Sequence, residues 1–397
     1  MNRGHVNLYS GGEVSRDEII HFEDLARKFS EKTALPMFGG DHADGNLALL
    51  PDIINVAFEI GIASSPDSSS CGYEYGIWGC SADSTSLVYS LVLLATLAET
   101  CGGIAMCCHS QGVASNIIAQ AKKELSFVPR RAGVCVQEGS SPPWCGTLSA
   151  PHRDLPARVA TQAVQTGDGY LLNGTKAFTY CMNEVDGFVV FAREGEQWAS
   201  FVVPADAPGL TLEDVGHRTG LRACRLNHVV LHNVALSEAH RIDDGDALDL
   251  VIRALFLNWA GMSAIATGIA KSAVKAARVY MSERYQGGSL LEDHPAMKLL
   301  VADAAARTRA AEAAVFSLKG LNPLLKECLK AAAMTKLTVM ELCARAVTDS
   351  LQVMGGYGYM EDYGQEKRLR DITVLKSASG SPNYLKQLIF DLDKEGI

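Results

Sequence analysis

The spacing of apolar residues changes twice along this chain, and that change constrains its fold more than any other feature. Up to residue 131, apolar residues recur at helical spacing, for example over residues 15–32 behind a possible N-cap at Ser15. From Ala132 short segments alternate with a period of two, and after Ala247 the helical spacing returns. The sequence therefore predicts an α+β fold with an N-terminal helical domain (1–131), a middle β domain (132–246) and a C-terminal helical bundle (247–397).

Local signals agree with this division. The strongly apolar stretch over residues 86–104 and its continuation after Gly112 predict two buried helices in the first domain. In the β domain, Asn173-Gly174 has the composition of a two-residue hairpin turn. The alanine-rich stretches beyond residue 295 permit close packing of helices, as in a bundle.

The charge and cysteine content exclude several classes of protein. With 36 basic and 45 acidic residues the formal charge is -9, and the basic residues do not cluster, so we expect no binding to nucleic acid or to anionic membranes. No apolar run reaches the length of a membrane span and the N-terminus lacks an apolar signal core, which predicts a cytoplasmic protein. The eleven cysteines contain no paired C-x-x-C, so we expect buried, reduced thiols.

Three short segments near the C-terminus carry the strongest chemical signal. Residues 352–358 read Q-V-M-G-G-Y-G, residues 366–371 read E-K-R-L-R-D, and residues 379–381 read S-G-S. This order resembles the C-terminal region of acyl-CoA dehydrogenases, in which Q-x-x-G-G-x-G and E-K-x-x-R-D precede a catalytic E-G-T. At the position of the catalytic glutamate this chain has Ser379.

Further segments extend the resemblance from about residue 85 to the end of the chain. Residues 134–138 (V-C-V-Q-E) resemble the family's C-x-T-E strand end, and residues 169–176 (G-Y-L-L-N-G-T-K) its G-Y-x-L-N-G-x-K segment. Residues 282–284 (S-E-R) resemble the E-R before a helix that reaches a neighbouring subunit's flavin. The resemblance implies an acyl-CoA dehydrogenase-like fold with a C-terminal four-helix bundle, FAD as cofactor, and a homo-oligomer, either a dimer or a tetramer.

The resemblance also implies which residues contact the flavin. A pyrophosphate needs a cation and backbone N–H donors at close approach, which Arg284 and the glycines Gly355 and Gly356 could supply. Gln352 offers an amide to the adenosine or ribityl portion, and Ser381 keeps a hydroxyl at the threonine position of E-G-T. A helix C-cap glycine pair and a solvated arginine are the alternative interpretation of the same residues.

Beside the flavin ring, this chain departs from the family. The family's threonine, tryptophan and threonine positions there are occupied by Gln137, Phe178 and Tyr180. The expected P-G-A-G-S-D is replaced by the sequence of residues 139–146, G-S-S-P-P-W-C-G. The loop beside the flavin is therefore predicted to be remodelled.

The residues that would perform the family's chemistry are missing. Dehydrogenation of an acyl thioester needs a carboxylate to take the α-proton while the β-hydride passes to the flavin, and a serine cannot act as that base unaided. Some relatives carry the glutamate on the helix after the β domain, where this chain has Asn258. Nearby, Phe256 and Trp259 replace an aspartate and an arginine expected beside the substrate. The pattern predicts a rebuilt active site in which the catalytic base is unknown.

Other titratable residues are weaker candidates. His109 lies on a helical stretch that could face the substrate cavity, although a core histidine would look the same. Glu99 and Glu138 lie near the ends of elements that approach the site in the family, where capping or packing is the alternative. His228 and His232 share a strand face without a third ligand, so we expect no metal site.

Three functions remain open from the sequence. The first is an FAD-dependent oxidoreductase that acts on an acyl thioester of CoA or a carrier protein with an altered active site. An electron-transfer flavoprotein is the candidate electron acceptor. The second is a noncatalytic subunit that pairs with a glutamate-bearing paralogue in a hetero-oligomer. The third is a flavin-free binding protein. Fold-level resemblance alone does not separate them.

Overall fold

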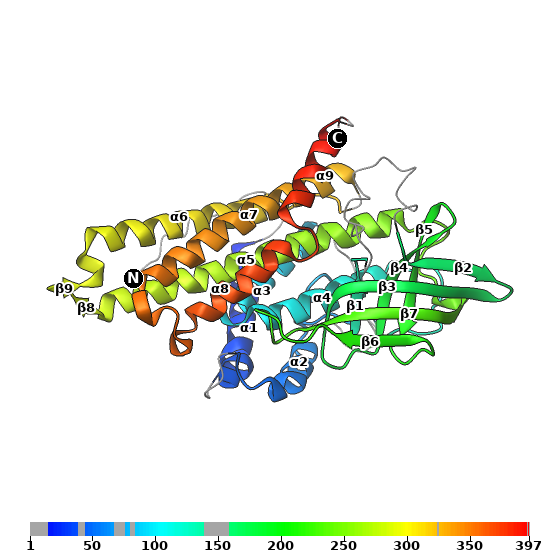
Figure 1. Ribbon diagram of the computed structural model, residues 1–397, viewed down its shortest axis with the longest axis horizontal. Coiled ribbons are helices and arrows are strands. Elements are labelled where there is room, and N and C mark those ends of the chain that lie inside the picture. Colours follow the sequence, from blue (N-terminus) through cyan, green and yellow to red (C-terminus); the bar gives the residue numbers. More distant parts are fainter. Residues whose placement is uncertain are drawn as a thin grey trace.

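The computed structural model describes residues 15–38, 44–66, 76–79, 84–138, 159–323, 325–394 and 396. The remodelled loop predicted at residues 139–146 lies outside these residues. Within the described residues, the elements follow the predicted order of helices, strands and helices (Figure 1).

The N-terminal region contains helices that the structure describes as α1 to α4, and the last of them is fully buried. They are α1 (Arg16–Phe29), α2 (Leu50–Glu59), α3 (Ser84–Thr100) and α4 (Gly102–Ile118). The predicted N-cap is confirmed: the Ser15 hydroxyl accepts a hydrogen bond from the Glu18 amide and the Glu18 carboxylate accepts one from the Ser15 amide, which is a capping box. The two predicted buried helices are α3 and α4, and every residue of α4 is buried. Because α4 is enclosed on all sides, it can position side chains precisely in the interior.

The middle region is a seven-stranded sheet in the order β1-β4-β2-β3-β7-β6, with β5 paired to β4. The strands are β1 (Ala132–Cys135), β2 (Gln162–Thr166), β3 (Gly169–Cys181), β4 (Gly187–Glu194), β5 (Gln197–Pro204), β6 (Leu210–Asp214) and β7 (Arg225–Ser237). β1 and β4 are parallel, whereas β3 pairs antiparallel with β2 and β7. Both faces of β4 are buried, because Phe188 and Val190 pack in the core of the sheet while Val189 and Phe191 pack with the helices.

The predicted hairpin turn at Asn173-Gly174 is wrong. Both residues lie inside β3, and the turn that joins β2 to β3 falls between Thr166 and Gly169. Gly174 has φ +145° at a register shift against β7, and a Cβ there would lie 2.6 Å from the Thr161 Cα. The glycine therefore serves a β-bulge and a close backbone approach rather than a reversal of the chain.

The C-terminal region is a bundle built around one long helix. It contains α5 (Leu248–Glu283), α6 (Pro295–Phe316), α7 (Lys326–Val353) and α8 (Gln365–Ser377), and α9 (Pro382–Lys394) packs against α7. The short strands β8 (Tyr285–Gln286) and β9 (Ser289–Leu290) join α5 to α6. At 1.5 Å per residue, α5 is about 54 Å long. It runs from the sheet to the far tip of the bundle (Figure 1).

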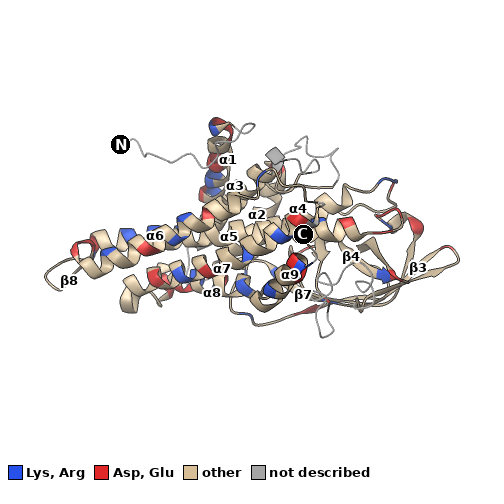
Figure 2. Cartoon of the chain, turned by 90° about the horizontal axis from the view of Figure 1, so that it is seen from above, with Lys and Arg blue, Asp and Glu red and all other residues tan. Residues whose placement is uncertain are grey.

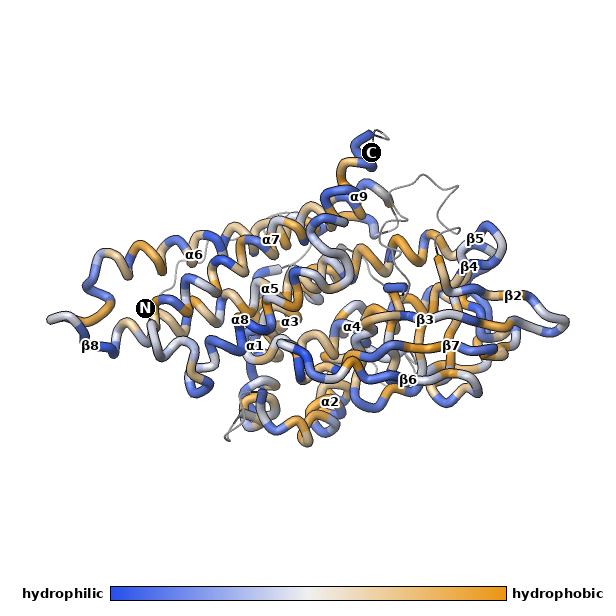
Figure 3. Tube along the Cα trace, viewed as in Figure 1, coloured by the Kyte–Doolittle hydropathy of each residue, from blue (hydrophilic) through white to orange (hydrophobic). Residues whose placement is uncertain are grey.

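Burial explains the apolar composition of α5. Among the described helices it alone has the length and composition of a membrane span, but 94% of its apolar window is buried inside the fold, as in a core helix. Figure 3 shows hydrophobic residues along the part of α5 nearest the sheet. Charges of both signs are interspersed along α6 (Figure 2).

The eight described cysteines are free and buried, as predicted. The remaining three, Cys71, Cys80 and Cys145, lie outside the described residues.

Candidate functional site

The segment at the family's catalytic position is a tight, supported loop between α8 and α9. Ser379 has φ +49° and Gly380 has φ +126°, both in the left-handed half of backbone space. The Trp259 indole N–H donates to the Ser379 carbonyl oxygen at 2.6 Å. Ser381 immediately precedes α9, and its hydroxyl accepts a long hydrogen bond of 3.4 Å from the Tyr384 amide. The backbone of this loop is therefore held in place whatever side chain residue 379 carries.

Lys336 is a second support that the sequence analysis missed. Its side chain is fully buried on α7, and its ammonium donates to the carbonyl oxygens of Ala378 and Gly380, the latter at 2.9 Å. The sequence feature that could have identified Lys336 as a buried residue is its position near Val339 and Met340 on an apolar helix face. A buried ammonium needs such acceptors, because an uncompensated buried charge is costly.

At the second glutamate position, Asn258 belongs to a buried chain of hydrogen bonds. The Trp78 indole N–H donates to His109 Nδ1 at 2.8 Å, and His109 Nε2 lies 2.9 Å from Asn258 Oδ1. Because Nδ1 accepts, the neutral ring carries its proton on Nε2 and donates it to the Asn258 oxygen. The Asn258 amide nitrogen makes no hydrogen bond within the described residues and remains available as a donor. Such a donor can bind a carbonyl oxygen but cannot abstract a proton.

This geometry argues against His109 as the catalytic base. The residue is fully buried, and burial lowers its pKa from 6.5 to about 4 despite the hydrogen bond to Asn258. Both ring nitrogens are already engaged, by Trp78 and by Asn258. Gly261 makes room for the ring, since a Cβ at that position would lie 2.3 Å from the His109 imidazole. His109 therefore orients Asn258 rather than exchanging protons near neutral pH.

The buried histidine predicts a stability difference with pH. Its pKa is lower in the folded protein, about 4 against 6.5, so the unfolded chain binds the extra proton first as the pH falls. The wild type should therefore lose about 3 kcal/mol of unfolding free energy between pH 7 and pH 4 that His109→Gln does not lose. Urea unfolding of both proteins across this range measures the difference. Parallel pH curves would contradict the assignment of a buried, neutral His109.

The three residues predicted beside the flavin ring lie close together on the sheet. The Gln137 carbonyl oxygen accepts from the Ala177 amide at 2.8 Å, which places Gln137 next to Phe178. Phe178 has φ +50° and is 45% exposed, and its ring meets the His228 ring edge-on at 5.0 Å. Tyr180 is buried, burial raises the pKa of its phenol, and its carbonyl accepts from the Ser110 hydroxyl at 2.5 Å. Only Phe178 offers an open aromatic face.

The adjacent Glu138 is a structural residue. Its carboxylate pairs with the Lys176 ammonium, and both side chains are buried. The second carboxylate oxygen accepts from the Thr161 amide and hydroxyl at 3.1 and 2.8 Å. With both oxygens engaged, Glu138 is not available as a base, and the packing alternative for this residue is the better one.

The predicted pyrophosphate contacts lie at the tip of the bundle. The Arg284 guanidinium stacks on the Tyr357 ring at 5.3 Å, makes no ion pair within the described residues, and its buried Nε has no hydrogen-bond partner. Gln352, Gly355 and Gly356 are exposed nearby, and Gly355 has φ +56°. This tip presents an unpaired cation beside an open, glycine-rich turn.

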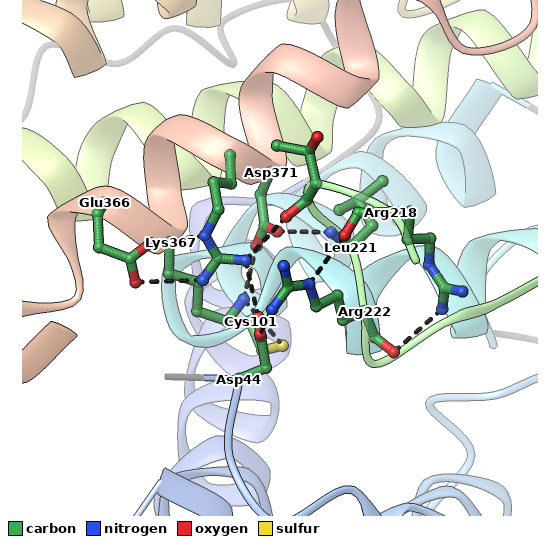
Figure 4. A network of polar contacts seen from close by, with 10 residues as sticks. Asp44, Cys101, Arg218, Leu221, Arg222, Glu366, Lys367 and Asp371 are labelled. Atoms are coloured by element: carbon green, nitrogen blue, oxygen red, sulfur yellow. Dashed lines mark hydrogen bonds and ion pairs between the residues drawn. The ribbon is translucent and has the colours of Figure 1, made fainter. Parts of the chain in front are cut away.

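The E-K-x-x-R-D segment joins the three regions of the chain (Figure 4). On α8, Arg370 pairs with Glu366 and with Asp44, at 2.6 and 3.0 Å. Asp44 also pairs with Arg222 at 2.7 Å, next to the sheet. Asp371 accepts from the Leu221 amide and from Lys367, both at 2.6 Å. The segment thus fastens the bundle to the N-terminal and middle regions and carries the chain toward Ser379.

The structure divides the predicted site residues into two groups. Asn258, Phe256 and Trp259 lie together on the buried part of α5. His109 contacts Asn258, and its neighbour Ser110 donates to the Tyr180 carbonyl oxygen, which connects this part of α5 to the sheet. Trp259 donates to the Ser379 carbonyl oxygen, which connects it to the loop before α9. Arg284, Gln352, Gly355 and Gly356 lie at the bundle tip. Asn258 and the end of α5 at Glu283 are 25 residues apart, or about 38 Å along the helix.

Comparison with known families supports the same architecture. Residues 154–234 match the model described as the acyl-CoA dehydrogenase middle domain, and residues 248–391 match the acyl-CoA dehydrogenase C-terminal domain.

Individual relatives were also found. The chain is 30% identical over 249 residues to an acyl-CoA dehydrogenase of Bacillus subtilis, covering 61% of this chain and 65% of that protein. It is 28% identical over 237 residues to subunit CarC of the caffeyl-CoA reductase-Etf complex of Acetobacterium woodii, covering 58% and 62%. The chain thus spans less than two thirds of the length of these relatives. A glutaryl-CoA dehydrogenase of Mycobacterium smegmatis, solved in complex with FADH2, has the same fold, with TM-score 0.77, 18% identity, and coverage of 96% and 95%.

Proposed function

Because the chain belongs to the acyl-CoA dehydrogenase superfamily, we propose that it is an FAD-dependent oxidoreductase acting on an acyl thioester of CoA or a carrier protein, with an altered active site. The observation that carries the proposal is the supported loop at Ser379. Trp259 and Lys336 hold its backbone although the glutamate is gone. Both supports act on backbone atoms, so they hold this loop in one conformation whichever side chain residue 379 carries.

The donor set fits FAD, the cofactor of this family. Among the described residues, the buried Arg284 Nε has no hydrogen-bond partner and the guanidinium has no carboxylate partner, so the tip of the bundle is suited to a pyrophosphate. On the sheet, Phe178 presents an exposed ring of the kind that packs on a flavin. Ser381 fits less well, because its hydroxyl already caps α9. When bound, FAD would supply the hydride acceptor.

The residues of this chain would position a thioester rather than deprotonate it. The Asn258 amide nitrogen is free to donate to a carbonyl oxygen, and His109 and Trp78 fix its orientation. Of the described candidates for a base, Ser379 stands in place of the glutamate and His109 and Glu138 are engaged. Glu99 lines a separate cavity that none of the proposed substrate residues lines. We therefore infer a reaction whose proton acceptor differs from the family's usual glutamate.

A second candidate function is a noncatalytic subunit that pairs with a glutamate-bearing paralogue. The separation of the two groups of site residues favours it, since the bundle tip keeps its flavin-binding character while the other end has lost both glutamates. In either case, a flavin near Phe178 would need Arg284 of another subunit, so we propose a dimer or a larger oligomer. An electron-transfer flavoprotein is the proposed acceptor, by analogy with the Etf complex that contains CarC.

Arg284→Gln tests the flavin assignment. Natively purified protein should carry FAD, and loss of the charge-assisted hydrogen bonds of Arg284 should weaken FAD binding about 10- to 100-fold. Arg278→Gln, an exposed arginine on the same helix, is the matched control and should retain FAD. Absorbance and mass spectrometry of the released cofactor measure the result. A colourless wild type would instead support a flavin-free binding protein.

The two candidate functions differ in how the bound flavin responds to thioesters. Bleaching of the flavin by members of an acyl-CoA and acyl-carrier panel in the isolated homo-oligomer would support the oxidoreductase. Bleaching that requires an added paralogue would support the noncatalytic subunit.

A further inference from the structure

A large cavity lies between the N-terminal helices and the bundle, away from Ser379. Its volume is about 740 Å³, and its walls come from the C-terminal ends of α1 and α3, from α5, and from the segment 354–368. This volume is within the usual range for small-molecule sites, roughly 300–1,000 Å³. None of the proposed flavin or substrate residues lines it.

The lining of the cavity includes polar groups without partners among the described residues. Glu99 makes no ion pair or hydrogen bond within the described residues, and burial raises the pKa of its carboxyl, partly offset by Lys271 and other cations. Ser30 also lines the cavity, is 3% exposed, and its hydroxyl has no hydrogen-bond partner. The buried Ser30 hydroxyl is costly to leave unpaired unless a ligand completes it, and the half-buried Glu99 carboxylate beside the same cavity is open to a ligand cation.

A second unpaired charge lines the same cavity. The Arg368 guanidinium donates to the Ser272 hydroxyl at 2.6 Å and to the Tyr363 carbonyl at 3.3 Å, but it has no carboxylate partner among the described residues. A guanidinium in this state has remaining donors suited to a bidentate carboxylate.

The two unpaired charges do not satisfy each other. The charges that affect the pKa of Glu99 are those of Lys271, Arg27, Lys275 and Glu23, and the charge that affects Arg368 is that of Asp371. No ion pair joins Glu99 to Arg368 within the described residues. The charged lining residues include four acids and three bases, which disfavours polyanions such as nucleotides as well as polycations.

We propose that this cavity binds a small zwitterion, an amino acid or ω-amino acid, whose ammonium group is held by Glu99 and whose carboxylate is held by Arg368. Tyr280 and Tyr363, whose rings meet at 5.8 Å, provide an aromatic wall for the intervening chain. The Tyr357 ring contacts the rings of both tyrosines, and the Arg284 guanidinium stacks on Tyr357. The tyrosines therefore lie between the proposed zwitterion site and the proposed flavin contact. The site goes beyond the proposed oxidoreductase function and does not depend on it.

A length series of zwitterions tests the proposal. Glycine, β-alanine, 4-aminobutyrate, 5-aminovalerate and 6-aminohexanoate are titrated by calorimetry and thermal shift, with butylamine and butyrate as single-charge references. We expect binding to peak at one chain length and to exceed that of both references. Glu99→Gln and Arg368→Gln should each weaken the best ligand about tenfold or more.

Matched controls make the result decisive. Glu59→Gln and Arg278→Gln remove exposed charges outside the cavity and should leave binding unchanged. Glu99→Gln should also raise the melting temperature of the ligand-free protein, because it removes an unpaired carboxylate, so loss of binding in this variant is not loss of fold.

Three results would overturn the proposal. They are no binding by any member of the series, equal binding by the references, and unchanged binding in both cavity variants. A change in oligomeric state on Glu99→Gln without any ligand effect would also overturn it, by indicating that a second copy fills the cavity. Measuring FAD content in the same samples separates this outcome from failure of the proposed oxidoreductase function.

Discussion

Ser379→Glu is expected to raise acyl-CoA-dependent dye reduction about 10²- to 10⁴-fold, the usual contribution of a positioned general base. The loop that would carry the glutamate already exists, because Trp259 and Lys336 hold the backbone on both sides of residue 379. Serine already occupies φ +49° there, so a glutamate adds little new backbone strain. Steady-state assays with a panel of acyl-CoA thioesters measure the gain.

Ser379→Gln is the control for this gain. It has nearly the same shape as glutamate but cannot accept a proton, so its activity should stay at the wild-type level. If the glutamate variant retains FAD and binds thioester yet shows no gain over glutamine, the missing base is not what separates this chain from ordinary dehydrogenation. The remodelled surroundings of Phe256 and Trp259 would then be the cause.

Glu138→Gln is expected to lower the unfolding free energy by about 3–5 kcal/mol, because it leaves the Lys176 ammonium buried without its counter-charge. Both side chains of this pair are at most 1% exposed. The pair also joins the end of β1 to β3 beside Gln137 and Phe178, so the proposed flavin surface should loosen with it. Urea unfolding and retained FAD measure the two effects.

Glu184→Gln provides the matched control for the buried pair. Glu184 pairs with Arg131 at 2.5 Å, but its side chain is 65% exposed, so water screens the interaction. We expect a loss of no more than about 1 kcal/mol. Equal losses of unfolding free energy in the two variants would show that burial adds little to the stabilisation by the Glu138–Lys176 pair.

Much of the fold could be predicted because it depends on local patterns. The capping box at Ser15 and the apolar periodicity of α3 and α4 act within a few residues of one another. The hairpin at Asn173-Gly174 was predicted wrongly because the same two residues suit a turn and a bulge. The pairing with β7 and the close approach of Thr161 determine that Gly174 forms a bulge rather than a turn, and both come from other parts of the chain.

The candidate site was less predictable, since its supports come from distant segments. Lys336 lies 43 residues before Ser379, and Trp78 lies 180 residues before Asn258. No periodicity or motif links such positions. The sequence identified His109 as a candidate but could not show which ring nitrogen carries the proton. That tautomer depends on the hydrogen bond donated by the Trp78 indole N–H.

By itself, the sequence determined the three-part architecture and the family resemblance, and it predicted that Ser379 and Asn258 occupy the two glutamate positions, because these depend on residue type and order. Only the tertiary structure decided what the remaining polar groups do. It tied Glu138 to Lys176, turned the amide oxygen of Asn258 toward His109, and left Glu99 and Arg368 unpaired in one cavity. The physical reason is that the state of a buried polar group is set by the partners and the water that remain around it after folding.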